Sequence, residues 1–96
     1  MKKKREERGL QSIPSIGPAL ERDLRLIGVD RPSCLKGKDP EKLYRKLQQV
    51  TGMHHDRCVL YTFRCAVYYV NEKHHDSELL KWWSWSDENI TKRMKG

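Results

Sequence analysis

The segment that most constrains the fold is the apolar stretch from about Asp56 to Asn71. Its apolar residues recur at helical spacing over a wide arc and are Val59, Leu60, Phe63, Ala66, Val67 and Val70. A surface helix carries a narrower apolar stripe, so this arc predicts a central helix against which the other elements pack. Its β-branched and aromatic residues make a strand the competing interpretation, but its length and spacing favour a helix.

Start and stop signals predict two helices before this one. Leu20, Leu24 and Ile27 share one face of a helix that ends at Gly28, a residue that readily adopts the left-handed conformation. The run Asp39-Pro40-Glu41 supplies a cap, a first-position proline and a first-turn acid for a helix that ends at Gly52. The residues that we expect this second helix to bury are Leu43, Tyr44, Leu47 and Val50.

Shorter helical turns are predicted elsewhere. Pro32 or Ser33 can begin one turn that carries Cys34 and Leu35 inwards. After the central helix, we expect another short helix over residues 76–82 and a cap at residues 86–88 for a final polar segment. The expected architecture is therefore all-α with five to six short helices. A single domain over residues 9–86 would lie between a basic arm, 1–8, and a polar, basic segment, 87–96.

The net charge of +7 favours polyanionic partners, although a soluble protein with excess lysine has the same balance. The excess is concentrated at the ends, with +3 on residues 1–8, +2 on 81–96 and +2 on the 72 residues between them. A solvated tail is the default interpretation of residues 1–8, and a phosphate-binding arm is the alternative.

Three other classes of protein are disfavoured. No apolar run approaches the roughly 20 residues of a membrane-spanning helix. The odd number of cysteines, with Cys34, Cys58 and Cys65, favours a reducing cytoplasm over a secreted disulfide framework. No serine, histidine or glycine-rich catalytic motif is visible, and Cys58, Cys65 and His54 lack the spacing of a zinc site. We therefore expect neither an enzyme nor a cofactor.

The stretch Leu10–Ile27 suggests a helix, a hairpin over Pro14-Ser15-Ile16-Gly17, and a second helix opened by Pro18. Gly17 can adopt dihedral angles closed to other residues, and proline suits the first helical position. Such a turn leaves free amides at the positive end of a helix dipole, which suits a phosphate oxygen. The plain alternative is a tight αα-hairpin.

The residues of this stretch resemble the helix-hairpin-helix motif at its apolar anchors and second glycine, which are Leu10, Ile13, Pro14, Ile16, Gly17 and Leu24. With the later runs LKGKDPEKLYRKL, DRCVLYTFRCAVYYV and ELLKWW, residues 9–86 resemble the bacterial pathogenicity-locus family of small helix-hairpin-helix proteins. Some members of that family are labelled mitomycin resistance proteins. The resemblance implies an all-α, SAM-like domain.

The resemblance also implies DNA binding without sequence preference, with the hairpin contact at Ser15, Ile16 and Gly17. Two residues depart from the motif, because Ser15 replaces a glycine and Glu21 replaces a small residue and would repel a phosphate. Positive charge must then come from elsewhere. The candidates are residues 1–8 and the basic residues Lys36, Lys38, Lys42, Arg45 and Lys46.

Two further surfaces remain open. One is a stripe on the central helix made of Arg57, Tyr61, Arg64 and Tyr68, which could contact phosphates and stack on bases. The favoured interpretation is structural: the arginine stems and the tyrosine rings cover the core. Trp83 and Trp85 alternate and cannot share a helix face, so at least one should lie across the domain or stay exposed. Core packing that fixes the C-terminus is the favoured interpretation, and a patch for a protein partner is the alternative.

The sequence thus predicts a non-enzymatic, cytoplasmic helix-hairpin-helix protein that binds DNA weakly, without sequence preference and in a salt-dependent way. It could serve as an accessory factor in DNA maintenance or stress resistance. The alternative is a SAM-like module that binds a protein partner through its tryptophan-rich C-terminal surface.

Overall fold

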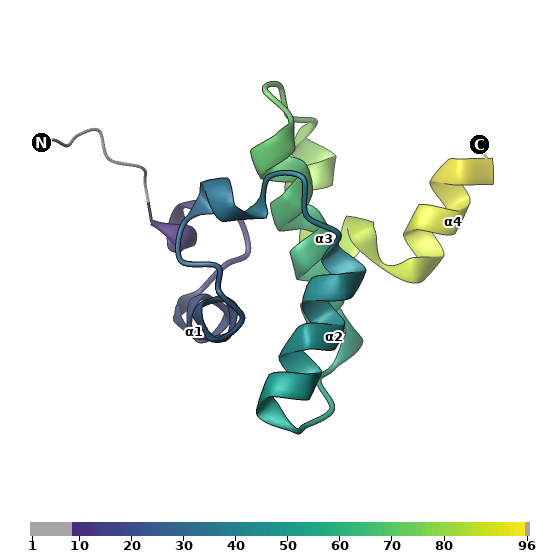
Figure 1. The fold of residues 1–96 in the computed structure, drawn as a ribbon. Helices are drawn as coiled ribbons and strands as arrows, with labels where there is room; N and C mark the ends of the chain where they lie inside the picture. The colour runs from purple at the N-terminus through teal and green to yellow at the C-terminus, as the bar shows by residue number, and fades with distance from the viewer. Residues whose placement is uncertain (1–8, 96) are drawn as a thin grey trace, which may run out of the picture.

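The central element is α3 (Arg57–Asn71), as the apolar arc predicted. The computed structural model describes residues 9–95, so the predicted arm, 1–8, lies outside the described residues. Within them the other α-helices are α1 (Pro18–Leu26), α2 (Pro40–Thr51) and α4 (Asp87–Lys95), and there is no strand (Figure 1). The all-α prediction is confirmed.

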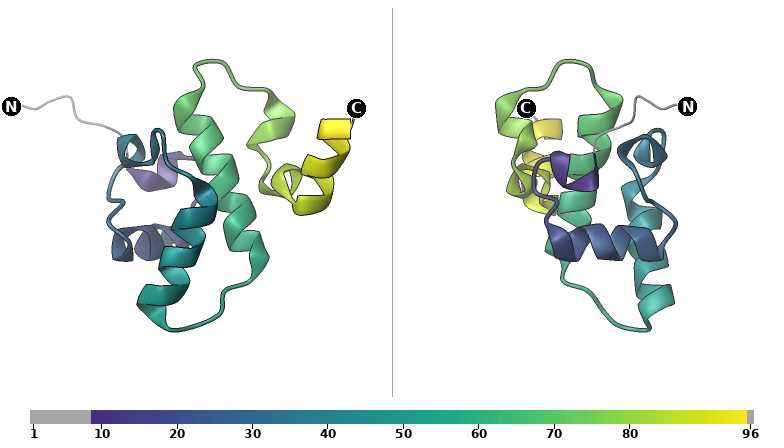
Figure 2. Two further views of the ribbon diagram at one scale, coloured as in Figure 1. Left: turned by 45° about the vertical axis from the view of Figure 1, so that its right-hand side comes forward. Right: turned by 90° about the vertical axis from the view of Figure 1, so that its left-hand side faces the viewer.

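Four single 3-10 turns complete the described part of the chain: η1 (Leu10–Ser12), η2 (Pro32–Leu35), η3 (Ser77–Leu80) and η4 (Trp82–Trp85). Figures 1 and 2 show α3 between two groups of elements, with α1, η1 and η2 on one side and η3, η4 and α4 on the other. In place of the expected five to six helices, the described residues form four α-helices and these four turns.

The helix ends follow the predicted capping residues. The Asp39 carboxylate accepts a hydrogen bond from the Glu41 amide at 2.9 Å, and α2 ends at Gly52 with a φ of 67°. Gly28, with a φ of 91°, ends α1, and the Val29 amide donates to the Leu24 carbonyl at 2.9 Å. This is the bond of a Schellman motif, which satisfies carbonyls that the helix end would leave free.

The core forms where α1, α2, η1 and η2 pack with the buried face of α3. Its largest fully buried side chains are Phe63, Leu10, Ile13, Leu24, Leu35, Leu47, Leu60 and Cys65. Val50 was predicted to be buried, but 51% of it is exposed. Thr51, four residues after the buried Leu47, occupies the inward position in the last turn of α2. Its hydroxyl donates to the Leu47 carbonyl and lies 2.9 Å from His55 Nε2.

Candidate nucleic-acid interface

The opening hairpin differs from the prediction in its first arm. The described residues show one 3-10 turn, Leu10–Ser12, before the hairpin and no full helix. Gly9 begins this turn and Ile13 ends it with a φ of −78° and a ψ of 133°. A residue that precedes proline is pushed towards such extended dihedral angles, so Pro14 stops the turn.

The hairpin also needs left-handed backbone at a different residue from the one expected. Ser15 has a φ of 74°, a region that favours glycine. Gly17 has a φ of −99° and a ψ of −173°, which any residue can adopt. The expectation for Gly17 was therefore wrong. The motif usually has a glycine at the position of Ser15, and the positive φ at this position would favour a glycine there.

The start of α1 carries amides that find no hydrogen-bond acceptor among the described residues. Pro18 has no N–H, and the first amide of the helix to find a carbonyl is that of Glu21, which donates to Gly17 at 2.9 Å. Among residues 9–95, the amides of Gly17, Ala19 and Leu20 make no hydrogen bond, whereas the Ile16 amide donates to the Ile13 carbonyl. The hairpin thus presents free donors, but Ile16 is not one of them.

Glu21 ties the two arms of the hairpin together. Its carboxylate accepts hydrogen bonds from Gln11 Nε2 at 2.7 Å and from Arg25 Nη2 at 2.9 Å. The hydrogen bond from Gln11, followed by the one from Arg25, lowers the pKa of Glu21, so this carboxyl is ionised at neutral pH. Its negative charge lies within the first turn of α1 and weakens the attraction of an anion there.

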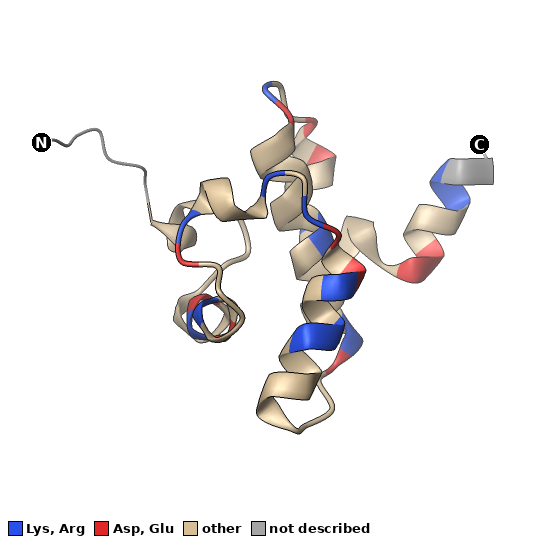
Figure 3. Ribbon diagram, in the orientation of Figure 1, with Lys and Arg blue, Asp and Glu red and all other residues tan. Residues whose placement is uncertain are grey.

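A stronger electrostatic feature lies at the other end of α1. A groove of about 660 Å³ runs between the end of α1, the turn η2 and the first half of α2. We call it the basic groove, because four of its lining residues are Lys36, Lys38, Lys42 and Lys46. Figure 3 shows the positive segments on the loop before α2 and on the face of α2 turned towards the viewer.

The local fold holds these four lysines together. Gly37, with a φ of 74°, turns the loop, and its amide donates to Asn71 Oδ1 at 3.2 Å. Lys42 and Lys46 are one turn apart on α2. All four lysines are exposed, and within residues 9–95 none of them forms an ion pair. Asp39, the one acid that the described residues contribute to the lining, is engaged as the cap of α2.

The structure therefore divides the predicted phosphate-binding residues into two places. Ile27 and Gly28, at the end of α1, line the basic groove, whereas Ser15 and Gly17 lie just before the first residue of α1. A nine-residue helix is about 13 Å long, so the groove and the free amides are separated by about that distance. Arg45 is exposed on α2 but does not line the groove.

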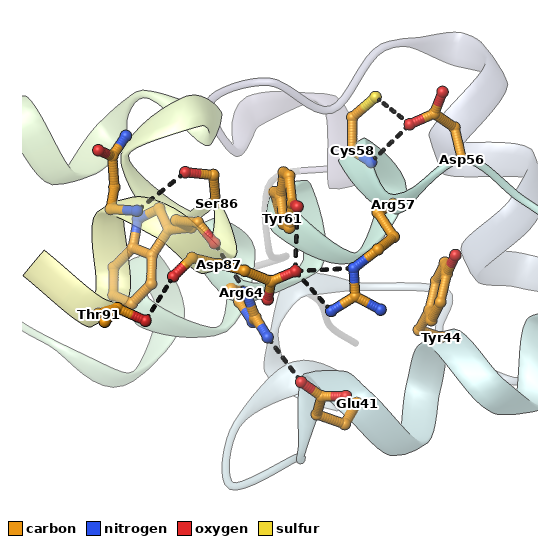
Figure 4. A network of polar contacts seen from close by, with 12 residues as sticks. Glu41, Tyr44, Asp56, Arg57, Cys58, Tyr61, Arg64, Ser86, Asp87 and Thr91 are labelled. Atoms are coloured by element: carbon orange, nitrogen blue, oxygen red, sulfur yellow. Dashed lines mark hydrogen bonds and ion pairs between the residues drawn. The ribbon is translucent and has the colours of Figure 1, made fainter.

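Three residues of the predicted stripe on α3 converge on one acid of α4 (Figure 4). Arg57 Nε and Nη2 donate to Asp87 Oδ2 at 2.8 and 2.7 Å, and Tyr61 Oη donates to the same oxygen at 3.1 Å. Arg64 Nη1 donates to Asp87 Oδ1 at 3.0 Å, and its Nη2 donates to Glu41 Oε2 at 2.6 Å. We call these five residues the Asp87 cluster.

Sequence reasoning missed Asp87 and Glu41 as partners of this stripe. The residues of α3 include two arginines and no acid, and one of these arginines, Arg64, has only 12% of its side chain exposed. A buried guanidinium needs an acid, and α3 has none, so the acid has to come from another element. The two arginines of an otherwise apolar helix without an acid were the signal in the sequence. Partial burial opposes ionisation of Asp87, but hydrogen bonds from Arg64, Arg57 and Tyr61 outweigh it and lower its pKa.

The tryptophans separate as their alternation predicted. Trp85 packs on Tyr68 with ring centroids 5.3 Å apart, and its indole N–H donates to the Leu79 carbonyl at 2.8 Å. Tyr68 completes the predicted stripe, and its hydroxyl accepts from the Asp76 amide at 2.8 Å. Trp83 is 52% exposed, and the Lys81 ammonium lies 5.9 Å from the centre of its ring.

The cysteines are free thiols with separate surroundings. Cys65 is fully buried, and burial raises its pKa to about 11. Cys58 Sγ lies 2.9 Å from Asp56 Oδ1, and this hydrogen bond raises the pKa of the thiol. In the part of the chain that the structure describes, no three histidine, cysteine or acidic residues are grouped to hold a metal ion. None of the described helices is long and apolar enough to cross a membrane.

One comparison with known proteins gives a match. The family model Cdd1, described as pathogenicity locus, matches residues 3–91, which includes all of the basic groove and the Asp87 cluster. No curated protein and no solved structure matches the chain.

Proposed function

This chain belongs to the Cdd1 pathogenicity-locus family, and we propose that it binds DNA through backbone phosphates without sequence preference. The observation that carries the proposal is the basic groove. Four exposed lysines are held within one loop and two turns of helix, and no ion pair within residues 9–95 neutralises them. Like charges gathered in this way repel one another, and a polyanion relieves that repulsion.

The side chains of the groove suit phosphates better than base edges. Lysine presents a flexible point charge, whereas base recognition uses planar side chains with paired donors and acceptors. The charged groups that line the groove are ammonium groups, apart from the capping carboxylate of Asp39, and the lining includes no planar amide or guanidinium side chain. Contacts of this kind position a nucleic acid and do not select its sequence, so binding should be weak and should depend strongly on salt.

The hairpin would provide a second contact, in keeping with a helix-hairpin-helix motif in a SAM-like domain. The free amides of Gly17, Ala19 and Leu20 lie about 13 Å from the groove along α1, so the two regions would engage different phosphates. The charge of Glu21 makes this contact the weaker of the two. A non-enzymatic, cytoplasmic accessory factor in DNA maintenance or stress resistance fits such binding.

The experiment is a fluorescence-anisotropy titration of a labelled DNA duplex with the full chain and with Lys42→Gln. One lost phosphate contact flattens the slope of log affinity against log salt by about 0.9 and lowers affinity about eightfold at 0.1 M salt. Lys92→Gln is the matched control, because Lys92 is exposed on α4 and pairs with Glu88 away from the groove. Equal losses in Lys42→Gln and Lys92→Gln would argue against the groove as the binding site.

A second candidate function is protein binding through the tryptophan segment. Trp83 is half exposed, and its edge-to-face contact with Trp82, at 5.6 Å between ring centroids, fixes its ring. A rigid exposed tryptophan is a frequent anchor of protein interfaces. A change in native mass on Trp83→Ala, together with no retention of DNA at about 0.15 M salt, would favour this function over DNA binding.

A further inference from the structure

Helix α4 lies at the edge of the fold, and polar contacts form much of its attachment. Its main packing partner is η4, and none of its residues from Asp87 to Arg93 is fully buried. Asn89 Nδ2 donates to the Trp83 carbonyl at 2.8 Å, and Arg93 Nη1 donates to the Ser84 carbonyl. Among the described side chains of α4, Asp87 alone forms ion pairs with α3, so this carboxylate is the principal polar connection between the two helices there.

Asp87 is held as a bound anion would be. Both oxygens of its carboxylate accept hydrogen bonds, with Arg57 and Tyr61 on Oδ2 and Arg64 on Oδ1. Two guanidinium groups and a phenol hydroxyl, all from one face of α3, thus surround a single small anion (Figure 4). Arginine is the side chain best suited to paired contacts with both carboxylate and phosphate oxygens.

The charges of the cluster balance only while Asp87 is present. Arg57 and Arg64 are matched by Asp87 and Glu41. If α4 moved away, Arg64 would keep its ion pair with Glu41, and the guanidinium of Arg57, about half of which is exposed, would lose its partner. An anion that took the place of Asp87 would restore the charge balance and occupy the same donors, so it would favour release of α4.

We propose that Arg57, Tyr61 and Arg64 form a second phosphate-binding site, which Asp87 occupies in this structure and vacates when a nucleic-acid phosphate replaces it. This inference rests on the proposed DNA binding. A phosphodiester carries two non-bridging oxygens on one atom, as a carboxylate does, and can accept from the same donors. DNA binding and release of α4 are then coupled, because the phosphate binds only the released state.

The test compares Asp87→Asn with Glu88→Gln in the duplex titration. Both variants remove one negative charge from the first turn of α4, but the ion pair that Glu88 forms within the described residues is with Lys92, at 3.7 Å. Asp87→Asn empties the site of its anion and should raise DNA affinity about tenfold, within the usual range of coupling between two sites. Glu88→Gln should change affinity by less than about twofold, since exposed charges are largely screened by salt.

A measurement on the unaltered chain covers the case in which Asp87→Asn fails to fold. Hydrogen exchange of the α4 amides should accelerate when a short DNA duplex saturates the protein, because α4 is released. Slower or unchanged exchange would mean that Asp87 is an anchor and not a substitute for phosphate. Equal affinities of Asp87→Asn and Glu88→Gln, with the unaltered chain still binding DNA, would overturn this inference alone. Absence of DNA binding by all three proteins would overturn the proposed function as well.

Discussion

Ser15→Gly should stabilise the protein, because Ser15 adopts a φ of 74° in the hairpin. A non-glycine residue in the left-handed region costs roughly 1–2 kcal/mol, and glycine removes that cost. Glycine also makes the unfolded chain more flexible, and this lowers the free energy of unfolding by about 0.5–1 kcal/mol. The Ser15 side chain is exposed and makes no hydrogen bond in the described part of the chain, so nothing else is lost.

The net gain in the free energy of unfolding has a range of about 0–1.5 kcal/mol, and its midpoint of about 0.75 kcal/mol raises Tm by roughly 3–6 °C for a domain of this size. Thermal unfolding followed by circular dichroism measures it. Ser33→Gly is the matched control, because Ser33 is also exposed, but it lies in η2 without a positive φ and should lose about 0.5–1 kcal/mol. If Ser15→Gly lowers Tm as much as Ser33→Gly does, the reasoning about the hairpin backbone is refuted.

Three further predictions concern single residues. Gly17→Ala should preserve fold and DNA affinity, since an added Cβ meets nothing within 4 Å, whereas Gly17→Pro should weaken DNA binding in the anisotropy assay by removing a free amide. Cys65 should resist iodoacetamide at pH 8 until the protein is denatured, as peptide mapping would show, because burial raises its pKa to about 11. Asp87 has a lowered pKa, so its stabilising contribution is complete above its unfolded pKa of about 3.9 and disappears as pH falls through its folded value. Denaturant titrations at pH 7 and pH 3 should therefore show a smaller pH dependence for Asp87→Asn than for the unaltered chain.

The helix ends could be predicted from sequence because their causes are local. Asp39 caps α2 through an amide two residues away, and the glycines that end α1 and α2 adopt left-handed dihedral angles. The central position of α3 followed from the width of its apolar arc, and Leu60, Phe63 and Ala66 are fully buried. In each case a few neighbouring residues determine the outcome.

Other features depended on competition that the sequence pattern hides. Leu10 and Ile13 have helical spacing, but Pro14 forces Ile13 into extended backbone, so only one 3-10 turn forms. The left-handed backbone expected of Gly17 is adopted by Ser15 instead. Here the identity of the residue did not reveal which backbone position carries the strain.

The Asp87 cluster depends on contacts that span 23 to 30 residues of sequence. Asp87 was assigned to a polar terminal segment, because no charge near it in the sequence pointed to α3. The basic groove was easier to anticipate, since its lysines lie within eleven consecutive residues. What the sequence did not reveal is that the groove and the hairpin amides lie at opposite ends of α1.

The most direct test of the central claim is a salt titration of duplex DNA binding with the full chain and with a chain that lacks residues 1–8. If the four lysines of the basic groove neutralise four phosphates, log affinity should fall with log salt at a slope of about −3.6 or steeper. The shortened chain should keep a slope of about −3.6 or steeper, because it retains all four lysines of the groove. A slope near zero in the shortened chain would contradict phosphate binding by the groove.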